Sequence, residues 1–375
     1  MSGAPSSKRT VRLGTRGSAL AVAQSSQVAR AITAASQRIG TDLEVELVEI
    51  RTRGDVDATP LTRLGGVGVF AAALREALLE GRCDLAVHSC KDLPTAPVPG
   101  LRIAAFPARE DPRDALCTTG GVGLADLPPG ARVGTGSPRR AAQLLAVRPD
   151  LEVVPVRGNV PTRLSRVVGA VVGADGPLGA VREPDLDAVV LALAGLRRLG
   201  LDDYATQVLA LPAGGGVGAA GAKSAGPAQS PAPAPVMVPA PAQGALALET
   251  RAEAGADPGL DATLAATLAE LDDASTRAAI TAERALMRRL EAGCAAPVGA
   301  VAVPATLADG RTGLRLDGVV AAVDGSRLLR ESATSSWADA ARLGDAVATA
   351  LLEAGAAELV DLHAAAPDRG RREAP

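Results

Sequence analysis

Short apolar runs alternate with amphipathic helical patterns through roughly the first 210 residues of the chain. The runs at 11–15 and 84–89 have the length of buried strands, and residues 18–36 and 70–81 have helical periodicity. This β-α-β rhythm predicts an α/β domain with mostly parallel strands. A second unit of similar plan begins near residue 111, so we expect two α/β lobes with a ligand cleft between them.

The domain boundaries follow from these patterns and from one shift in composition. We expect domain 1 over 9–107, with a returning strand at about 236–252, and domain 2 over 111–211. Residues 213–235 are low-complexity and rich in Ala, Gly and Pro, which predicts a disordered insertion. Helical patterns, three strand-like runs and a last helix predict a small α+β domain over 258–365.

The bulk composition argues against several classes of protein. Net charge is −3, and the only aromatic residues are two Phe, one Trp and one Tyr, so nucleic-acid binding by base stacking is not expected. No 18-residue window is apolar enough to span a bilayer and no apolar leader stands at the N-terminus, so a cytoplasmic protein without membrane binding is expected. Four cysteines without a CxxC pair, and two histidines, argue against a metal site.

Basic residues stand beside glycines and small residues where several apolar runs end. Asp92 lies among them, in HSCKDLPT. The basic residues of these segments are Arg16, Lys91, Arg139, Arg140, Arg157 and Arg163. Guanidinium forks and free N–H groups at helix N-termini are suited to carboxylates and phosphates. A small polyanionic ligand is therefore the first functional inference.

These segments, in this order, resemble the porphobilinogen deaminase (hydroxymethylbilane synthase) family of tetrapyrrole synthesis. The resemblance runs from about Arg12 to Glu358. Its motifs include TRGD (52–55), LAVHSCKDLPT (85–95), VGTGSPRRAAQL (133–144), VRGNVPTRL (156–164), QGALALE (243–249) and ERALMRRLEAGCAAPVGA (283–300).

The resemblance implies both a fold and a reaction. The fold is two type 2 periplasmic-binding-protein-like α/β domains plus a small α+β C-terminal domain. The implied enzyme is a transferase that condenses four porphobilinogen molecules head to tail on a covalent dipyrromethane primer, with release of ammonia. Hydrolysis then releases the linear tetrapyrrole hydroxymethylbilane. A monomer with porphobilinogen as its small-molecule substrate is expected.

By this resemblance, Asp92 is the catalytic residue and Cys294 carries the dipyrromethane through a thioether. One carboxylate within reach of pyrrole N–H groups stabilises the developing cations and can relay protons. A thiolate attack on an electrophilic pyrrole gives a thioether that suits a permanent primer. From the residues alone, Asp92 fits equally well as the N-cap of a helix after the strand at 84–89, and Cys294 as a small buried thiol.

The other site residues are implied by the same resemblance. Those that would bind the cofactor, together with Asp92 and Cys294, are Lys91, Ser89, Thr135, Ser137, Arg139, Arg140, Arg157 and Gly158. Those that would bind substrate are Arg16, Ser18, Arg163, Arg198 and Gln243. The alternative for the arginines, above all for Arg198, is an ordinary surface salt bridge. Ser18 also has the pattern of a helix N-cap.

The chain departs from the family pattern beside the expected cleft. A basic residue is usual where this chain has Val67, and a charged pair is usual at Ala72 and Ala73. The turn at Pro241 and Ala242 usually contains glycine. These departures could affect the gating by the loop beside the cleft and the turnover rate, and they leave the anion-binding and catalytic positions unchanged.

Two alternatives to the enzyme remain open. One is a non-catalytic or low-activity paralogue that binds polycarboxylates on the same fold. The other is a cysteine-nucleophile hydrolase, which would need a histidine near Cys294, whereas the histidines are His88 and His363. Asp92 and Cys294 favour the enzyme, because a pure binding protein needs neither.

Overall fold

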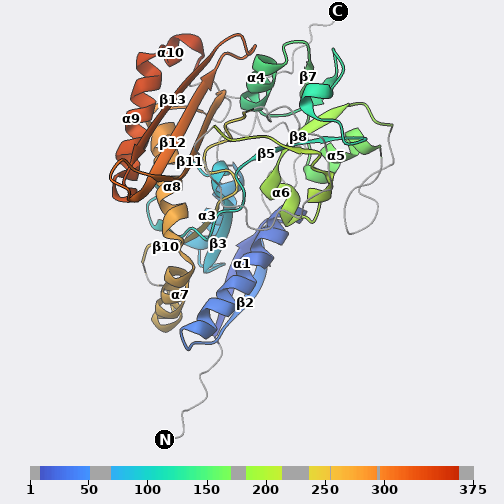
Figure 1. Ribbon diagram of the computed structural model, residues 1–375. Helices are drawn as coiled ribbons and strands as arrows, with labels where there is room; N and C mark the ends of the chain where they lie inside the picture. Colours follow the sequence, from blue (N-terminus) through green and yellow to red (C-terminus); the bar gives the residue numbers. More distant parts are fainter. Residues whose placement is uncertain are drawn as a thin grey trace, which may run out of the picture. The chain divides into compact units, whose positions relative to one another are not determined.

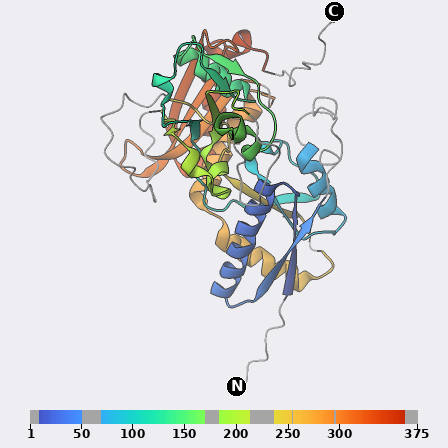
Figure 2. The ribbon, with the colours of Figure 1, turned by 90° about the vertical axis from the view of Figure 1, so that its right-hand side faces the viewer.

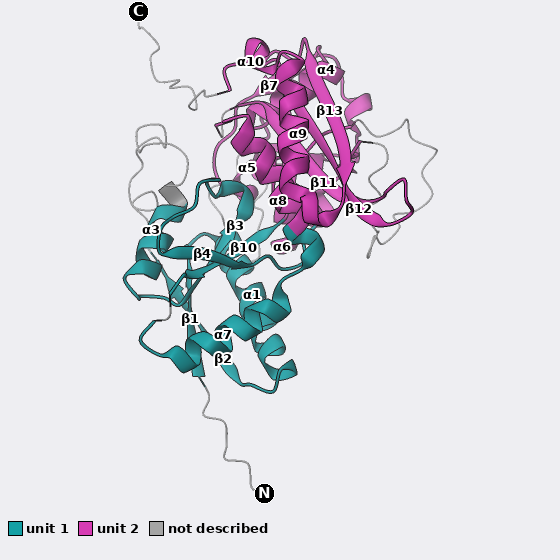
Figure 3. Cartoon of the chain, turned by 90° about the vertical axis from the view of Figure 1, so that its left-hand side faces the viewer, with its two compact units in different colours: residues 1–110, 245–277, 366–375 teal, residues 111–244, 278–365 magenta. Residues whose placement is uncertain are grey.

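A computed structural model describes residues 9–50, 69–169, 183–212, 236–253, 255–293 and 296–362. The chain forms two compact units (Figure 3). Unit 1 holds residues 1–110, 245–277 and 366–375, and unit 2 holds residues 111–244 and 278–365. The motif TRGD (52–55) and the predicted insertion at 213–235 lie outside the described residues.

Unit 1 is built on a five-stranded sheet in the order β2-β1-β3-β10-β4. Strand β1 runs parallel to β2 and β3, whereas β10 is antiparallel to β3 and β4. The strands are β1 (Arg9–Thr15), β2 (Leu43–Glu49), β3 (Leu85–Ser89), β4 (Leu101–Ala105) and β10 (Leu246–Arg251). The strands predicted at 11–15 and 84–89 are confirmed.

Helices cover both faces of this sheet (Figures 1 and 2). Helix α1 (Ala19–Arg38) buries Val28 and Ile32, four residues apart, against one face. Helix α3 (Val69–Leu79) buries Leu74 and Leu78, at the same spacing, against the other. Apolar residues four apart share one side of a helix, which is why each helix packs by a single stripe.

Two predicted boundaries differ from the structure. The strand expected at about 236–252 begins only at Leu246, and residues 236–244 belong to unit 2. Helix α7 (Pro258–Leu271), expected in the third domain, packs on the unit 1 sheet because Leu264 and Leu268 join the core around Leu13. Helical periodicity showed that α7 has an apolar stripe but not which sheet would bury it.

The first part of unit 2 repeats this plan with the order β7-β6-β8-β5-β9. Strand β6 is parallel to β7 and β8, and β5 is antiparallel to β8 and β9. Its strands are β5 (Asp114–Thr118), β6 (Arg132–Gly134), β7 (Glu152–Val154), β8 (Ala188–Ala192) and β9 (Gln207–Val208). Its helices are α4 (Pro138–Val147), α5 (Val160–Val168) and α6 (Leu193–Arg198). In both sheets the fourth strand is antiparallel, and the sequence patterns predicted neither β5 nor β9.

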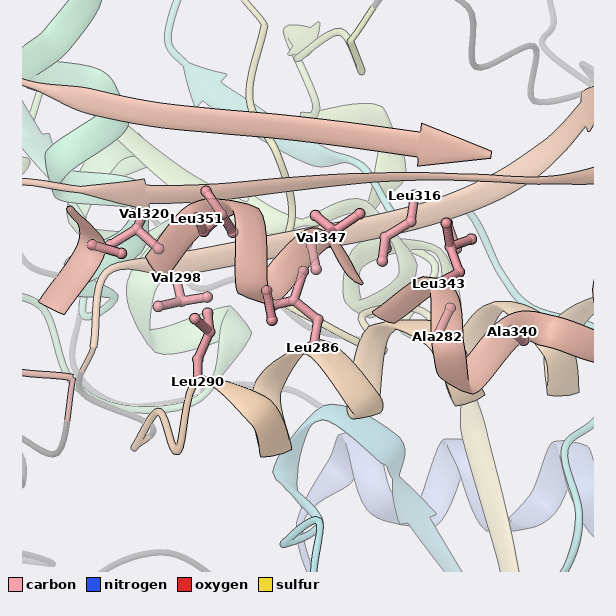
Figure 4. Packing of buried hydrophobic residues seen from close by; sticks show 14 of the residues in the cluster. Ala282, Leu286, Leu290, Val298, Leu316, Val320, Ala340, Leu343, Val347 and Leu351 are labelled. Carbon is pink, nitrogen blue, oxygen red and sulfur yellow. The ribbon is translucent and has the colours of Figure 1, made fainter. Parts of the chain in front are cut away.

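The rest of unit 2 is an antiparallel sheet, β11-β12-β13, with helices on one face. Its elements are α8 (Ala274–Arg289, in this unit from Ala278), β11 (Val298–Thr306), β12 (Thr312–Ala321), β13 (Leu328–Ser335), α9 (Ala340–Glu353) and α10 (Ala356–Leu359). Leu286 of α8, Leu316 of β12 and Val347 of α9 meet in one core (Figure 4). A Cβ on Gly344 would lie 2.2 Å from the carbonyl oxygen of Ala282, so glycine permits the close approach of α8 and α9. The predicted fold class, two α/β domains and a small α+β domain, is confirmed.

Candidate active site

In unit 1, two loops with predicted site residues leave the same edge of the sheet. Arg16 follows β1, and Lys91 and Asp92 follow β3. Strands β1 and β3 are parallel neighbours, with Leu13 opposite Leu85, so their carboxyl ends lie side by side. The carboxyl edge of a mostly parallel sheet is where α/β proteins bind ligands.

Asp92 is the last residue of a short 3₁₀ helix, Cys90–Asp92, and is exposed, as is Lys91. The N-cap position of this helix belongs to Ser89, so the interpretation of Asp92 as an N-cap is wrong. Asp92 is therefore accessible to solvent just after the carboxyl end of β3.

Helix α1 supplies a polar residue that the motif analysis missed. The Gln24 side chain is 5% exposed, and its Nε2 donates a hydrogen bond to Ser89 Oγ over 3.0 Å. This bond ties the first turns of α1 to the end of β3. A buried glutamine on the inner side of a predicted helix was the available signal. Ser18 caps the same helix, its Oγ accepting from Ala21 N over 3.3 Å, which confirms the predicted N-cap.

In unit 2, two further site loops share one edge. Thr135 and Ser137 follow β6, and Arg157 and Gly158 follow β7. The two strands are parallel, with Gly134 opposite Val154. The hydroxyl of Ser137 caps α4, and Ser137 N donates to Thr135 Oγ1 over 3.2 Å, so the turn is held by its own side chains.

The VRGN turn after β7 depends on a glycine. Gly158 has φ +100°, and a Cβ there would lie 2.9 Å from Thr162 Cγ2. Its carbonyl accepts a hydrogen bond of 2.8 Å from Arg163 Nε, while Arg157 is exposed. Burial lowers the pKa of Arg163, and the nearby charge of Arg140 lowers it further. The turn therefore positions two arginines differently: Arg157 is exposed, and Arg163 is hydrogen-bonded to the backbone of Gly158.

Arg139 and Arg140, at the start of α4, are buried around a single carboxylate. Asp114, at the start of β5, is fully buried. Its Oδ1 accepts from Arg140 Nη2 over 2.7 Å, and its Oδ2 lies 2.9 Å from Arg139 Nη1. Burial alone would raise the pKa of Asp114, but the two guanidinium charges outweigh it and hold that pKa far below its usual range.

Gln243 and Arg198 make their hydrogen bonds inside unit 2. The Gln243 side chain is 1% exposed, and its Nε2 donates to Asp114 Oδ1 and to the Pro112 carbonyl, both over 2.8 Å. Arg198 Nη2 donates to the Gly244 carbonyl over 2.7 Å. The substrate contact of Gln243 stays a prediction. Its side-chain amide is already hydrogen-bonded to Asp114 and Arg140.

Cys294 lies outside the described residues. The other three cysteines, Cys83, Cys90 and Cys117, are buried. Burial raises the pKa of Cys83 to about 11 and that of Cys117 to about 12, so these two thiols stay protonated and unreactive at neutral pH.

His88 is buried beside a carboxylate in unit 1. Its Nε2 lies 3.0 Å from Oε2 of Glu249. Among the described residues, no group of His, Cys, Asp or Glu could hold a metal ion. In the described part of the chain, no helix is long and apolar enough to cross a membrane.

The residues of the unit 2 edge suit a ligand with several carboxylates. Within the described chain, Arg139 Nε is buried without a hydrogen-bond acceptor. The pair Arg139 and Arg140 carries two positive charges against the one negative charge of Asp114. A dipyrromethane bears acetate and propionate groups, which would supply the acceptors and the charge that this edge lacks.

Comparison with known proteins covers nearly the whole chain. The family model "Porphobilinogen deaminase, dipyromethane cofactor binding domain" matches residues 11–256, and "Porphobilinogen deaminase, C-terminal domain" matches residues 277–353.

Curated relatives agree with the family models. The porphobilinogen deaminase of Micrococcus luteus is 51% identical over 341 residues, which are 86% of this chain and 81% of the relative. That of Cutibacterium acnes is 48% identical, with 96% of this chain and 99% of the relative covered. Porphobilinogen deaminase 1 of Streptomyces coelicolor is 47% identical, with 94% and 98% covered. The chain therefore belongs to the porphobilinogen deaminase family.

Proposed function

We propose that Asp92 is the catalytic carboxylate of this enzyme and that the basic loops at the two sheet edges hold the carboxylates of primer and substrate. As a member of its family, the chain is a transferase, a hydroxymethylbilane synthase. It condenses four porphobilinogen molecules, releases ammonia and delivers the linear tetrapyrrole. A non-catalytic binding paralogue has no support among the relatives.

One observation carries the assignment of Asp92. Asp114 is fully buried between two arginines, whereas Asp92 is exposed, just after the end of β3. Loss of ammonia and attack by the next pyrrole both develop positive charge at pyrrole nitrogen. An exposed carboxylate can accept hydrogen bonds from those N–H groups and stabilise that charge, whereas a carboxylate already paired with two arginines cannot.

The cationic residues have a binding role. Arg16 and Lys91 in unit 1, and Arg157 and Arg163 in unit 2, follow parallel strands whose ends point the same way within each sheet. Guanidinium forks orient planar carboxylates, so they would fix each ring relative to the reacting atoms. Ser18, Ser89, Thr135, Ser137 and Gly158 would add hydrogen bonds, and Arg198 is a further candidate from α6. The cleft expected between the two lobes stays a prediction.

The family's cofactor is dipyrromethane, a covalent primer that supplies the pyrrole to which the first substrate is joined. Arg139, Arg140 and Lys91 would hold its carboxylates, and Cys294 would carry it as a thioether. Porphobilinogen is the substrate. We further expect a cytoplasmic monomer that needs neither nucleic acid nor a membrane, in keeping with the mixed surface charge.

An isosteric substitution tests the role of Asp92. Asp92→Asn removes the charge and keeps the shape, so the rate of porphobilinogen consumption should fall by at least about a hundredfold. Asp126→Asn is a matched control, because Asp126 is also exposed and also ends a 3₁₀ helix, Leu124–Asp126. The control should keep the wild-type rate. A rate near wild type for Asp92→Asn would show that the cation is stabilised elsewhere.

A further inference from the structure

Asp114 is a buried acid to which the proposed chemistry gives no role. It begins β5, an antiparallel strand inside the sheet, and none of its surface is exposed. A carboxylate is retained in such a place only when its oxygens are paired and hydrogen-bonded. Each oxygen of Asp114 is paired with a different arginine, and Oδ1 also accepts hydrogen bonds from Arg140 and Gln243.

Arg140 is held at several points of its guanidinium. Its Nε donates to Asp114 Oδ1 over 3.0 Å, and its Nη1 donates to the Val190 carbonyl of β8 over 3.0 Å. Its Nη2 also lies 3.4 Å from Gln243 Oε1. Arg140 is 6% exposed, so its position is set by the sheet and by residue 243 rather than by solvent.

Arg139 is held at one end only. Its Nη1 lies 2.9 Å from Asp114 Oδ2 and donates to the Val238 carbonyl over 2.7 Å. The Nε atom has no acceptor among the described residues, although the side chain is only 3% exposed. Asp114 thus anchors one edge of this guanidinium and leaves donors on another edge for a ligand.

The charges of this group do not balance. Two guanidinium groups face one carboxylate, which leaves one positive charge in a buried place. Burial lowers the pKa of Arg139 despite the opposing effect of Asp114, which is the sign of a cation short of partners. An anionic ligand group would complete the set.

We propose that Asp114 is a positioning residue for the primer: it orients Arg139 and Arg140 toward a dipyrromethane carboxylate, and Gln243 braces it. This inference rests on the proposed function, since it takes the ligand to be the primer. It gives Gln243 an indirect role, through Asp114 and Arg140, in place of a direct substrate contact.

The test measures primer loading in the full-length protein. Wild type, Asp114→Asn and Asp111→Asn are purified in parallel, and intact mass gives the fraction of each that carries a dipyrromethane adduct. Asp111 is the matched control, because its side chain is only 8% exposed, and it begins the same unit and pairs with Arg113 and Arg197 outside the group around Asp114. We expect Asp114→Asn to lose at least about tenfold in loaded fraction while Asp111→Asn loads like wild type.

The outcomes separate the two hypotheses. An unloaded wild type would overturn the proposed cofactor and this inference with it. A loaded wild type with an equally loaded Asp114→Asn, or an Asp111→Asn that loses loading to the same extent, would overturn only the positioning role. If Asp114→Asn does not fold, Gln243→Met decides the question, because it keeps both ion pairs and removes the brace. That variant should load severalfold less and bind substrate with a raised KM in its loaded fraction, and unchanged loading would overturn the proposal.

Discussion

The Nε2 atom of His88 lies 3.0 Å from Oε2 of Glu249, and Arg75 Nη2 lies 2.9 Å from Oε1 of the same carboxylate. His88 sits on β3, directly before Ser89, and Glu249 sits on the neighbouring strand β10. The ring of His88 is therefore engaged with a carboxylate in unit 1. A cysteine-nucleophile hydrolase needs a histidine to activate its cysteine. In the described part of the chain His88 is the only histidine, and it is already paired with Glu249.

The pairing of Glu249 predicts a pH-dependent loss of stability on substitution. Burial would raise the pKa of Glu249, but His88 and Arg75 outweigh it and lower that pKa below 4.5. Its contribution to folding is thus complete above the ordinary glutamate pKa and is lost as the pH falls through the lowered value. Glu249→Gln should lower the free energy of unfolding by about 3 kcal/mol at pH 7 and by less at pH 3.5 to 4. Urea unfolding at both pH values measures this. The exposed Glu76→Gln is the control, and an equal loss at both pH values would contradict the argument.

The turn at Ala242 predicts a stabilising substitution. Ala242 is buried with φ +62°, in the left-handed region, at the turn where the family usually has glycine. Its N–H is fixed by the carboxylate of Glu283, so the chain cannot relax there. Ala242→Gly should raise the free energy of unfolding by about 0.5–1 kcal/mol. Glycine relieves the strain of the left-handed backbone, and this gain exceeds the conformational entropy that glycine loses on folding. Ala240→Gly, at a residue without positive φ, should lower the melting temperature instead. A lower melting temperature for Ala242→Gly would show that the turn is not strained.

The VRGN turn predicts a loss of activity without a change of charge. Gly158→Ala would place a Cβ against Thr162 and would disturb the carbonyl that holds Arg163. A small displacement of a positioned group lowers rates strongly, so kcat/KM should fall by about tenfold. Gly120→Ala is the control, since Gly120 also has positive φ (+73°) but has open space around it. Similar losses in both variants would mean that general strain, and not the position of Arg163, sets the rate.

The burial of three cysteines predicts how many thiols react with a thiol reagent. Cys83 and Cys117 are buried with pKa values raised to about 11 and 12, and Cys90 is buried as well. Native protein should therefore show no fast reaction with Ellman's reagent at pH 8. After denaturation, three of the four cysteines should react, because the proposed thioether would block Cys294. A fourth reactive thiol in active enzyme would exclude attachment at Cys294.

Local pattern was enough to place most elements and the loops that carry the chemistry. Ser18 marks the start of α1, and the apolar run before Ser89 is β3, because caps and periodicity depend on residues a few positions apart. The basic residues beside glycines indicated the anionic ligand for the same reason. The roles proposed for Asp92 and Cys294 come from their motifs, but only the structure excluded Asp92 as a helix N-cap.

The sequence by itself determined the order of strands and helices, the polyanionic ligand class and, through its motifs, the family. Only the tertiary structure decided which sheet buries α7, that β5 and β10 insert antiparallel into the two sheets, and that Asp114 lies between Arg139 and Arg140. Gln243 reaches Asp114 across 129 positions of sequence, and Gln24 reaches Ser89 across 65. Such contacts leave no periodic trace in a single sequence, because they are made by packing between elements and not by neighbours along the chain.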